Sequence, residues 1–585
     1  MNLTNTQFVF EGKTKSVLIG GMVLGALCLG LTFLQDDEYH TRFWTNFLHN
    51  SVYFTGIAFT SMFFLSAQIT AFAGWNSLVK RVLESMSQFM FVGLALIAIL
   101  VIGVWAHLHH LYHWNTPGIT DPNNPIYDRI IAGKSGFLNP VWYTMGTLGF
   151  LAVWFFWAKK LRTASVDQDT METTSFDYYK KQRKWAASFL PLGGFLSTVF
   201  IWQTVMSIDP HWYSTMFAWY SMISMWLGSL SLTILIIIYL KSLGYMEYVT
   251  RDHLHDIGKY LFGISVFWTY LWFDQFMLIW YANNGEETIY FRERMDYYPV
   301  LFWGNLLLNF ITPFLILMRN DTKRKFGTMF FVSLIVFFGH WWDYFYMIKP
   351  GARIAAHEAT EIKEGKVGTH RTLTSMEKNT PAANMHSEMT MDKQHGEDAV
   401  AAAEAAGHKS EPEGVKGEDT AVSTHAKTEE GHAAAAEGEQ NKKPEANLPT
   451  SAQTEQQKTP SPLPANSGEQ NVDPDAVGEG HPAGGDPTHD ASHNEHGGDM
   501  EGNEPGHGHE VDAKGFLPGF TLPGFLELGT MIGFLSLFLF FFFNKLSSAS
   551  LVPWKDPYLE ESKHHETGAL ISTEVAEGHG HDDHH

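Results

Sequence analysis

The sequence predicts an all-α polytopic membrane protein of about ten transmembrane helices, two four-helix bundles plus flanking helices, with one long disordered insertion. Long apolar blocks separated by short polar loops fill most of the N-terminal part, and one more block stands near the C-terminal end. A bilayer core needs roughly 20 apolar residues per helix, and backbone groups in lipid must be satisfied within the segment. The period-two alternation of barrel strands is absent. We therefore expect helices near 16–34, 52–73, 89–112, 140–158, 187–206, 213–240, 258–281, 299–318, 326–347 and 524–544.

The long segment between the last two blocks has a different composition from the rest of the chain. Residues 351–512 hold few large apolar residues and are rich in Glu, Ala, Gly, His and Pro. Such a segment lacks the apolar content that offsets chain entropy, so we expect a disordered spacer. Metal capture by its histidines is the alternative, but they lack a fixed ligand spacing and no cysteine accompanies them.

Loop charges predict the orientation of the chain. If the N-terminus is cytoplasmic, most Lys and Arg residues of the short loops fall inside, from Lys80 and Arg81 to Lys325, and few fall outside. Both termini should then be cytoplasmic and the insertion periplasmic. The expected segments are a cytoplasmic N-terminus (1–14), a membrane domain of nine helices (15–350), the insertion (351–512), the tenth helix region (513–546) and a cytoplasmic tail (547–585).

The even spacing of the helices also suggests a parallel repeat. The second to fifth helices would form one four-helix bundle and the sixth to ninth another. The third helix would then match the seventh, and the fifth would match the ninth. Asp209 and His211 end the fifth helix, and His340 and Asp343 end the ninth, each pair beside tryptophan.

Ionisable groups at membrane depth are costly, so each needs a reason. Asp274 is the sharpest signal, because it stands inside WTYLWFDQFMLIWY, about two turns from the outer end of its helix. Burial among aromatic side chains would raise the pKa of its carboxyl and suit it to proton handling. A hydrogen bond to a neighbouring helix is the structural alternative. Asp209, His211, His340 and Asp343 are further proton-handling candidates near the outer face.

The remaining signals are weaker. His107 is the deepest of the histidines that close the third helix, and with Trp272 and Trp280 it is a candidate for contact with a quinone ring. His109, His110 and His113 are expected to face headgroups or water. The single cysteine, Cys28, rules out an iron–sulfur cluster held by this chain alone, and no CxxCH haem motif occurs. We expect no metal site and no covalently bound cofactor.

Four stretches resemble a known family. IYDRIIAGKSGFLNPVWY (126–143), IWQTVMSIDPHWYSTMFAWY (201–220), IGKYLFGISVFWTYLWFDQFMLIWYANNGEETIYF (257–291) and PWKDPYLEESKHH (553–565) resemble the second quinone-binding-type membrane subunit of bacterial alternative complex III. That complex is a quinol:cytochrome c oxidoreductase of the bacterial inner membrane. The resemblance covers most of the membrane part and the C-terminal tail, and it excludes 351–512.

The resemblance implies a fold like the membrane subunit of polysulfide reductase, the NrfD-like family. It also implies partners: a multihaem cytochrome c subunit, an iron–sulfur subunit, a monohaem cytochrome c and a paralogous ten-helix subunit that binds quinol. Haems and iron–sulfur clusters would sit only in those partners. This chain would contribute membrane scaffold, with menaquinone or menaquinol contact and proton conduction as compatible roles.

Two other functions compete with the respiratory subunit. A buried Asp274 and a parallel repeat would also suit an independent proton or cation transporter. The His-rich insertion would suit a metal-acquisition protein, although the four stretches that carry the resemblance lie outside it. Membrane lipids should surround the helices, and no nucleic acid partner is expected.

Overall fold

The computed structural model describes residues 7–172, 174–363 and 519–567. Most of the predicted insertion, and both chain ends, therefore lie outside the described residues. Within the described ranges the regular elements are helices, apart from an isolated antiparallel bridge between Gln7 and Ser550. Ten helices there are long and apolar enough to cross a membrane, which confirms the predicted polytopic all-α class.

The ten spans follow the predicted blocks in order, with different ends. They are α1 (Lys13–Leu34), α2 (Thr41–Thr70), α3 with α4 (Lys80–Ser87, Met90–Trp105), α6 with η4 and α7 (Pro140–Thr144, Met145–Gly149, Phe150–Asp169), α8 (Phe176–Thr204), α9 (Thr215–Ser242), α10 (Arg251–Ala282), α12 with η6 and α13 (Pro299–Leu306, Leu307–Ile311, Thr312–Leu317), α15 (Phe326–Lys363) and α18 (Phe525–Leu546). Short helices occupy the connections: η2 (Gly74–Leu78), η3 (His113–Asn115), α5 (Arg129–Lys134), η5 (Met206–Ile208), α11 (Gly285–Tyr297), α14 (Asn320–Arg324) and α19 (Leu559–Lys563).

Two of the boundaries that differ from the prediction matter for the site. The third span ends at Trp105, so the histidines that follow are not part of it. The ninth span, α15, does not end near residue 347 but continues to Lys363, past the expected start of the insertion. His340 and Asp343 therefore lie inside this helix rather than at its end.

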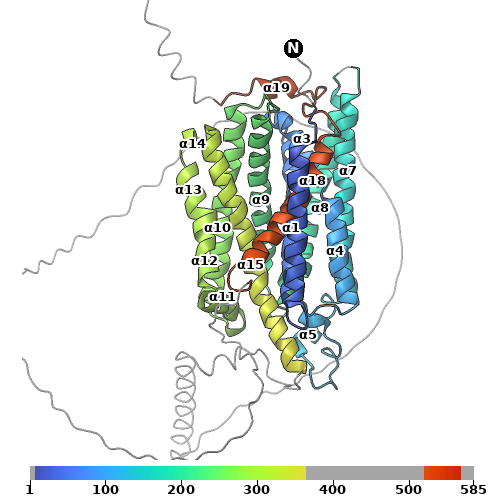
Figure 1. Ribbon diagram of the computed structural model, residues 1–585, viewed down its shortest axis with the longest axis vertical. Helices are drawn as coiled ribbons and strands as arrows, with labels where there is room; N and C mark the ends of the chain where they lie inside the picture. The colour runs from blue at the N-terminus through green and yellow to red at the C-terminus, as the bar shows by residue number, and fades with distance from the viewer. Residues whose placement is uncertain (1–6, 173, 364–518, 568–585) are drawn as a thin grey trace, which may run out of the picture. The chain divides into compact units, whose positions relative to one another are not determined.

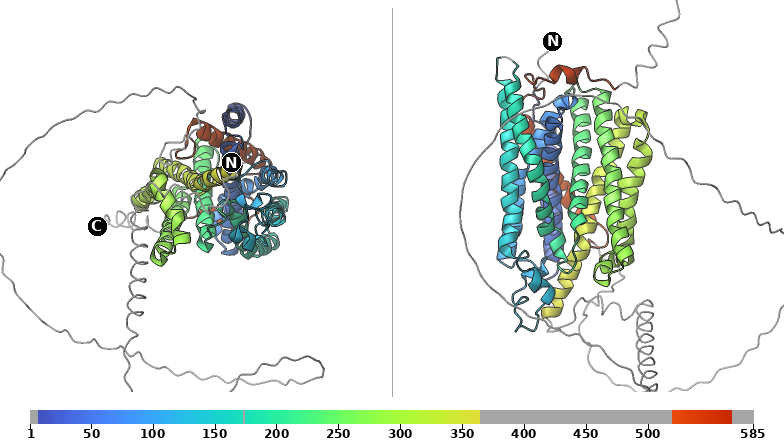
Figure 2. Two further views of the ribbon diagram at one scale, coloured as in Figure 1. Left: turned by 90° about the horizontal axis from the view of Figure 1, so that it is seen from below. Right: turned by 180° about the vertical axis from the view of Figure 1, so that it is seen from behind.

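The spans form two four-helix groups. In the first, α2 packs on α4 and α8, and α7 packs on α4 and α8. In the second, α9 packs on α10 and α15, while α12 and α13 pack on α15 and α10. Contacts of α2 with α9 and α15 join the groups, and α1 and α18 pack against each other on one flank (Figures 1 and 2).

The fourth and eighth spans share two local features. Each begins with proline at the first helical positions, Pro140 and Pro299, where the missing N–H costs nothing. Each is then interrupted by a π-helical turn, Met145–Gly149 in one and Leu307–Ile311 in the other. A parallel repeat places these two spans at equivalent positions in the two bundles.

The helix α18 is held to α1 by a close glycine contact. A Cβ added to Gly25 would lie 2.3 Å from the Cα of Gly533, so side chains at this crossing would force the helices apart. Small residues let membrane helices approach in this way. The contact fixes α18, and with it the buried Glu527 at its start.

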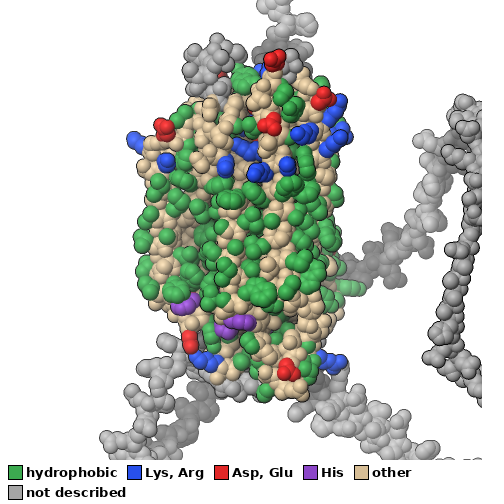
Figure 3. All heavy atoms as spheres, turned by 90° about the vertical axis from the view of Figure 1, so that its right-hand side faces the viewer, with side chains coloured by type: hydrophobic (Ala, Val, Ile, Leu, Met, Phe, Trp, Pro, Cys, Tyr) green, Lys and Arg blue, Asp and Glu red, His purple; other side chains and the backbone are tan. Residues whose placement is uncertain are grey.

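Charges separate the two ends of the bundle. Lys and Arg side chains gather toward the end that carries α14 and α19, whereas the middle band is mostly apolar (Figure 3). We call this the basic end, and the end that carries α5 and α11 the opposite end (Figure 1). The described N-terminal residues lie at the basic end, because Gln7 bonds the Ser547 carbonyl next to the tail.

Candidate functional site

A fully buried carboxylate, Asp343 on α15, is the centre of a polar cluster inside the spans. One oxygen, Oδ1, accepts a hydrogen bond from the Tyr220 hydroxyl and another from Asn305 Nδ2 at 3.0 Å. The other oxygen, Oδ2, accepts from Ser224 Oγ at 2.8 Å and from Trp268 Nε1 at 3.1 Å. The four donors are neutral, so hydrogen bonds alone satisfy this carboxylate.

Each of the four helices of the second bundle supplies part of this cluster. Tyr220 and Ser224 are one turn apart on α9, Trp268 is on α10, and Asn305 is on α12 just before the π-helical turn. Asn309, within that turn, donates to the Gly339 carbonyl at 3.0 Å and so anchors the turn to α15. Ser224 is about 14 Å along α9 from its start at Thr215, which puts the cluster at membrane depth, nearer the opposite end.

His340, one turn before Asp343, is connected to the carboxylate through Ser224. Its Nδ1 lies 3.0 Å from Ser224 Oγ and 4.0 Å from Asp343 Oδ2. Its Nε2 is buried and has no hydrogen-bond partner among the described residues. When Nδ1 carries the hydrogen, His340 donates to Ser224, and Ser224 donates to Asp343. A proton taken up at Nε2 can then pass through the hydroxyl to the carboxylate.

Aromatic and cationic groups lie between this cluster and the opposite end. Arg294 on α11 is only 1% exposed; its guanidinium lies 3.3 Å from the ring centroid of Tyr290 and donates to the Tyr290 carbonyl at 3.0 Å. Trp212 stacks on Tyr290 with 3.8 Å between centroids. Burial raises the pKa of Tyr290 to about 12, although the positive charge of Arg294 opposes the shift. Asp209 lies close enough to influence both groups electrostatically.

At the opposite end, two carboxylates lie close to two histidines. His211 Nε2 lies 2.6 Å from Asp128 Oδ2, and His113 Nδ1 lies 3.5 Å from Glu358 Oε2. Burial, together with the nearby His211, lowers the pKa of His113 to about 4. Burial tends to raise the pKa of Asp128, but hydrogen bonds from His211 and from the first turn of α5 outweigh it and lower the pKa.

A second buried polar group joins α2, α15 and α18. Arg42 forms a bidentate pair with Glu527 at 2.7 and 3.0 Å, and Asn46 Nδ2 donates to the same carboxylate at 3.0 Å. Lys349 Nζ donates to Asn46 Oδ1 at 2.7 Å. The local sequence does not indicate that Arg42, Asn46 and Lys349 join Glu527 in one group.

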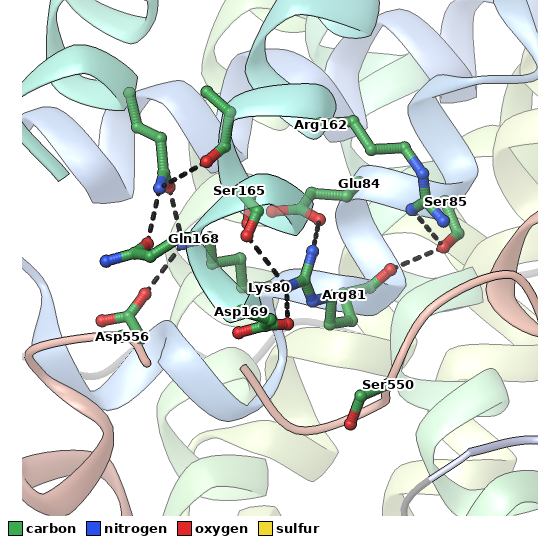
Figure 4. A network of polar contacts seen from close by, with 12 residues as sticks. Lys80, Arg81, Glu84, Ser85, Arg162, Ser165, Gln168, Asp169, Ser550 and Asp556 are labelled. Atoms are coloured by element: carbon green, nitrogen blue, oxygen red, sulfur yellow. Dashed lines mark hydrogen bonds and ion pairs between the residues drawn. The ribbon is translucent and has the colours of Figure 1, made fainter. Parts of the chain in front are cut away.

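A third network lies at the basic end (Figure 4). Lys80 pairs with Asp556 of the C-terminal tail at 2.8 Å, and Arg81 pairs with Glu84 at 2.8 Å and with Asp169. Arg162 donates to Ser85 Oγ at 2.9 Å. Burial tends to raise the pKa of Asp556, but the Lys80 ammonium outweighs this effect and the pKa is lowered. This network fastens the tail to the ends of α3, α7 and α8.

The structure brings together only part of the predicted site. His340 and Asp343 share one cluster, and Asp209 and His211 lie nearer the opposite end. Asp274 was expected inside the bundle, but it is partly exposed on the outward face of α10. Its neighbour Gln275 points inward and donates to Ser214 Oγ at 2.9 Å. The rotation of α10 about its axis places Gln275 inside and Asp274 outside, and the local sequence does not fix that rotation.

The predicted quinone contacts are also separated. Trp272 is buried and stacks with Trp268, 6.1 Å between centroids, whereas Trp280 is 65% exposed. His107 is exposed beyond the end of α4 with a positive φ of 50°, so it does not lie one turn deeper as expected. His109 is the buried histidine of this group, packed on Trp44, which corrects the expectation that it faces water.

The residues that sequence reasoning missed are neutral. Tyr220, Ser224, Trp268 and Asn305 complete the Asp343 cluster, but hydroxyl, indole and amide groups are common in membrane helices and carry no charge signal. Asn305 and Asn309, one turn apart in an apolar block, are the signal that could have indicated a polar face. Among the described residues no group of three or more His, Cys, Asp or Glu is arranged to hold a metal ion.

The described chain is therefore a helical membrane protein with ten spans. Its second bundle holds a buried carboxylate, Asp343, that accepts hydrogen bonds from neutral donors. No family model matches the sequence, and no curated protein matches it either.

Proposed function

We propose that this chain is a membrane subunit of a bacterial respiratory quinol:cytochrome c oxidoreductase of the alternative complex III type, and that its own chemistry is proton transfer at Asp343. The four stretches of resemblance support the assignment to that complex. The observation that carries the proton role is the buried Asp343 carboxylate, held by four neutral donors and connected to His340 through Ser224.

The neutral surroundings are what suit this carboxylate to proton transfer. A cation in contact would hold it ionised, and an apolar pocket would hold it protonated. Hydroxyl, indole and amide donors stabilise the anion without a fixed counter-charge, and the Ser224 hydroxyl can reorient when a proton arrives. His340 is the adjacent group that takes up or delivers that proton.

In this proposal the basic end faces the cytoplasm of the bacterial inner membrane, in agreement with the positive-inside rule. Electrons would pass through haems and iron–sulfur clusters of the multihaem cytochrome c, iron–sulfur and monohaem cytochrome c subunits. The paralogous ten-helix subunit would bind quinol. A menaquinol contact at Trp272 in this chain stays a prediction.

The test uses the native complex in proteoliposomes, with quinol oxidation and pH change measured together. Asp343→Asn keeps the size and most hydrogen bonds but cannot take up a proton, so proton movement per electron should fall at least tenfold at normal complex yield. Asp343→Glu should retain part of it. The matched control is Ser61→Ala. This change removes a buried hydroxyl on α2, in the first four-helix group, that lies 2.8 Å from Ser229 Oγ.

Full proton movement in Asp343→Asn would remove this carboxylate from the mechanism. The competing function, an independent proton or cation transporter, predicts ion flux by the purified chain alone in liposomes. The subunit proposal predicts none without the redox partners.

A further inference from the structure

Three acidic residues stand inside the apolar blocks of the sequence, and two of them are satisfied within the chain. Asp343 accepts four hydrogen bonds, and Glu527 is paired with Arg42 and bonded by Asn46. The third, Asp274, is partly exposed on α10, and none of the described residues donates a hydrogen bond to it. An ionisable group in a membrane span is expected to face the protein interior or a partner.

The position of Asp274 along the helix puts its carboxylate below the membrane surface. Trp280 and Tyr281, both strongly exposed, are aromatic residues of the kind that mark the interface. Asp274 is roughly 10 Å closer to the middle of the bilayer than Tyr281. Water is therefore not a ready partner for its oxygen atoms.

The surrounding face is open and aromatic. Tyr270 and Leu278, one turn before and after Asp274, are 58% and 50% exposed, and Phe273 and Met277 beside them are also exposed. Large aromatic residues and methionine are enriched where proteins meet. The adjacent polar residue, Gln275, faces inward, where it donates a hydrogen bond to Ser214.

We infer that this face of α10, defined by Tyr270, Phe273, Asp274, Met277 and Leu278, is covered by a transmembrane helix of a different polypeptide that presents a basic side chain to Asp274. Charge complementarity selects the occupant. A second copy docked symmetrically through the same face would place two Asp274 carboxylates side by side. The nearest basic residue of α10 itself, Lys259, is roughly 22 Å away along the helix, so this face offers another copy no cation.

The inference is independent of the proton role of Asp343, because it concerns the outward face of a different helix. Its test uses the full chain in its native membrane, with p-benzoylphenylalanine in place of Tyr270 or Leu278. The probe in place of Phe195, which is 72% exposed on α8 of the other bundle, is the control for non-specific capture. After illumination, the crosslinked peptides are sequenced.

The expected result is one adduct from both α10 probes, absent with the Phe195 probe, whose peptide is an apolar segment containing Lys, Arg or His. Asp274→Lys should lower the yield of that adduct at least fivefold, and the reverse charge change at the partner's basic residue should restore it. Asp274→Asn, which is close in size, covers the case in which Asp274→Lys fails to accumulate, and should lower the yield by a smaller factor.

Three outcomes would overturn the inference. The first is lipid adducts only, which would mean that the face lies in the bilayer. The second is an adduct with a second copy of the chain. The third is an adduct that does not depend on charge, because the partner peptide has no basic residue or because the yield is unchanged in both Asp274 variants.

Discussion

The network at the basic end and the cluster around Asp343 are both buried, but they hold charge in different ways. At the basic end, buried ions form pairs of opposite charge: Lys80 meets Asp556, and Arg81 meets Glu84 and Asp169 (Figure 4). Around Asp343 the contacts come from neutral groups. A paired ion is held in one protonation state, whereas a carboxylate among neutral donors is free to change state.

Under the proposed function, this difference separates a structural role at the basic end from proton transfer at Asp343. Removing one partner of a buried pair leaves an uncompensated charge, so the basic end should be sensitive to single changes and tolerant of paired ones. The Asp343 cluster should behave in the opposite way, with modest effects on stability and large effects on proton transfer.

The largest effect is expected for Lys80→Met. It strands Asp556, which also receives a hydrogen bond from Ser77, and removes the bond from Lys80 to Gln182 at 2.7 Å. The loss of folding free energy should be on the order of 3–5 kcal/mol, measured by detergent or denaturant unfolding of the purified chain. Combining Lys80→Met with Asp556→Leu should recover most of it. A double variant as unstable as the single one would contradict the paired-charge account.

A smaller effect on stability, but a clear one on activity, is expected for Ser224→Ala. It removes the hydroxyl that joins His340 to Asp343 and leaves the other three donors in place. Proton movement should fall about tenfold, equivalent to about 1.4 kcal/mol in the barrier. Ser221→Ala is the matched control, since Ser221 is equally buried on α9 but bonds Met347 Sδ at 3.2 Å. Equal losses in both variants would indicate packing rather than a relay.

The free energy that keeps the His113 loop folded, at the opposite end, should change with pH by about 1–2 kcal/mol. The pKa of His113 is about 4 in the fold and 6.5 without it, so the unfolded loop binds more protons between these values. Stability of the loop should therefore fall as the pH drops from 6.5 toward 4. Hydrogen exchange over residues 107–131, compared at pH 7.5 and pH 5, should show this loosening. Burial also lowers the pKa of His109, in the same segment, to about 4, so His113→Gln should reduce the response and not abolish it. An unchanged pH dependence would disprove the assignment.

The smallest effect is expected for Lys180→Ala. Lys180 and Asp177 form an ion pair at 3.3 Å, but their side chains are 69% and 83% exposed. Exposed pairs contribute little, because water and salt screen them. Unfolding of the purified chain should not change measurably. A loss comparable with that of Lys80→Met would contradict the view that solvent screens this pair.

The local sequence was sufficient for the number and order of the spans, because hydropathy is a sum over neighbouring residues and a bilayer fixes the required length. It also indicated His340 and Asp343 as the proton-handling candidates of the ninth helix. It placed them at the end of that helix, because hydropathy falls after residue 347, whereas α15 continues through more polar residues to Lys363. Beyond the bilayer a helix can continue through polar residues, so a fall in hydropathy does not show where the helix ends.

The packing of the helices against one another determined which polar groups meet. Tyr220, Ser224, Trp268 and Asn305 come from three helices, and their convergence on Asp343 depends on the rotation and depth of each helix. The same rotation turned Gln275 inward and Asp274 outward. A helix whose apolar residues surround it gives no local preference for either face, so packing against neighbouring helices makes the choice.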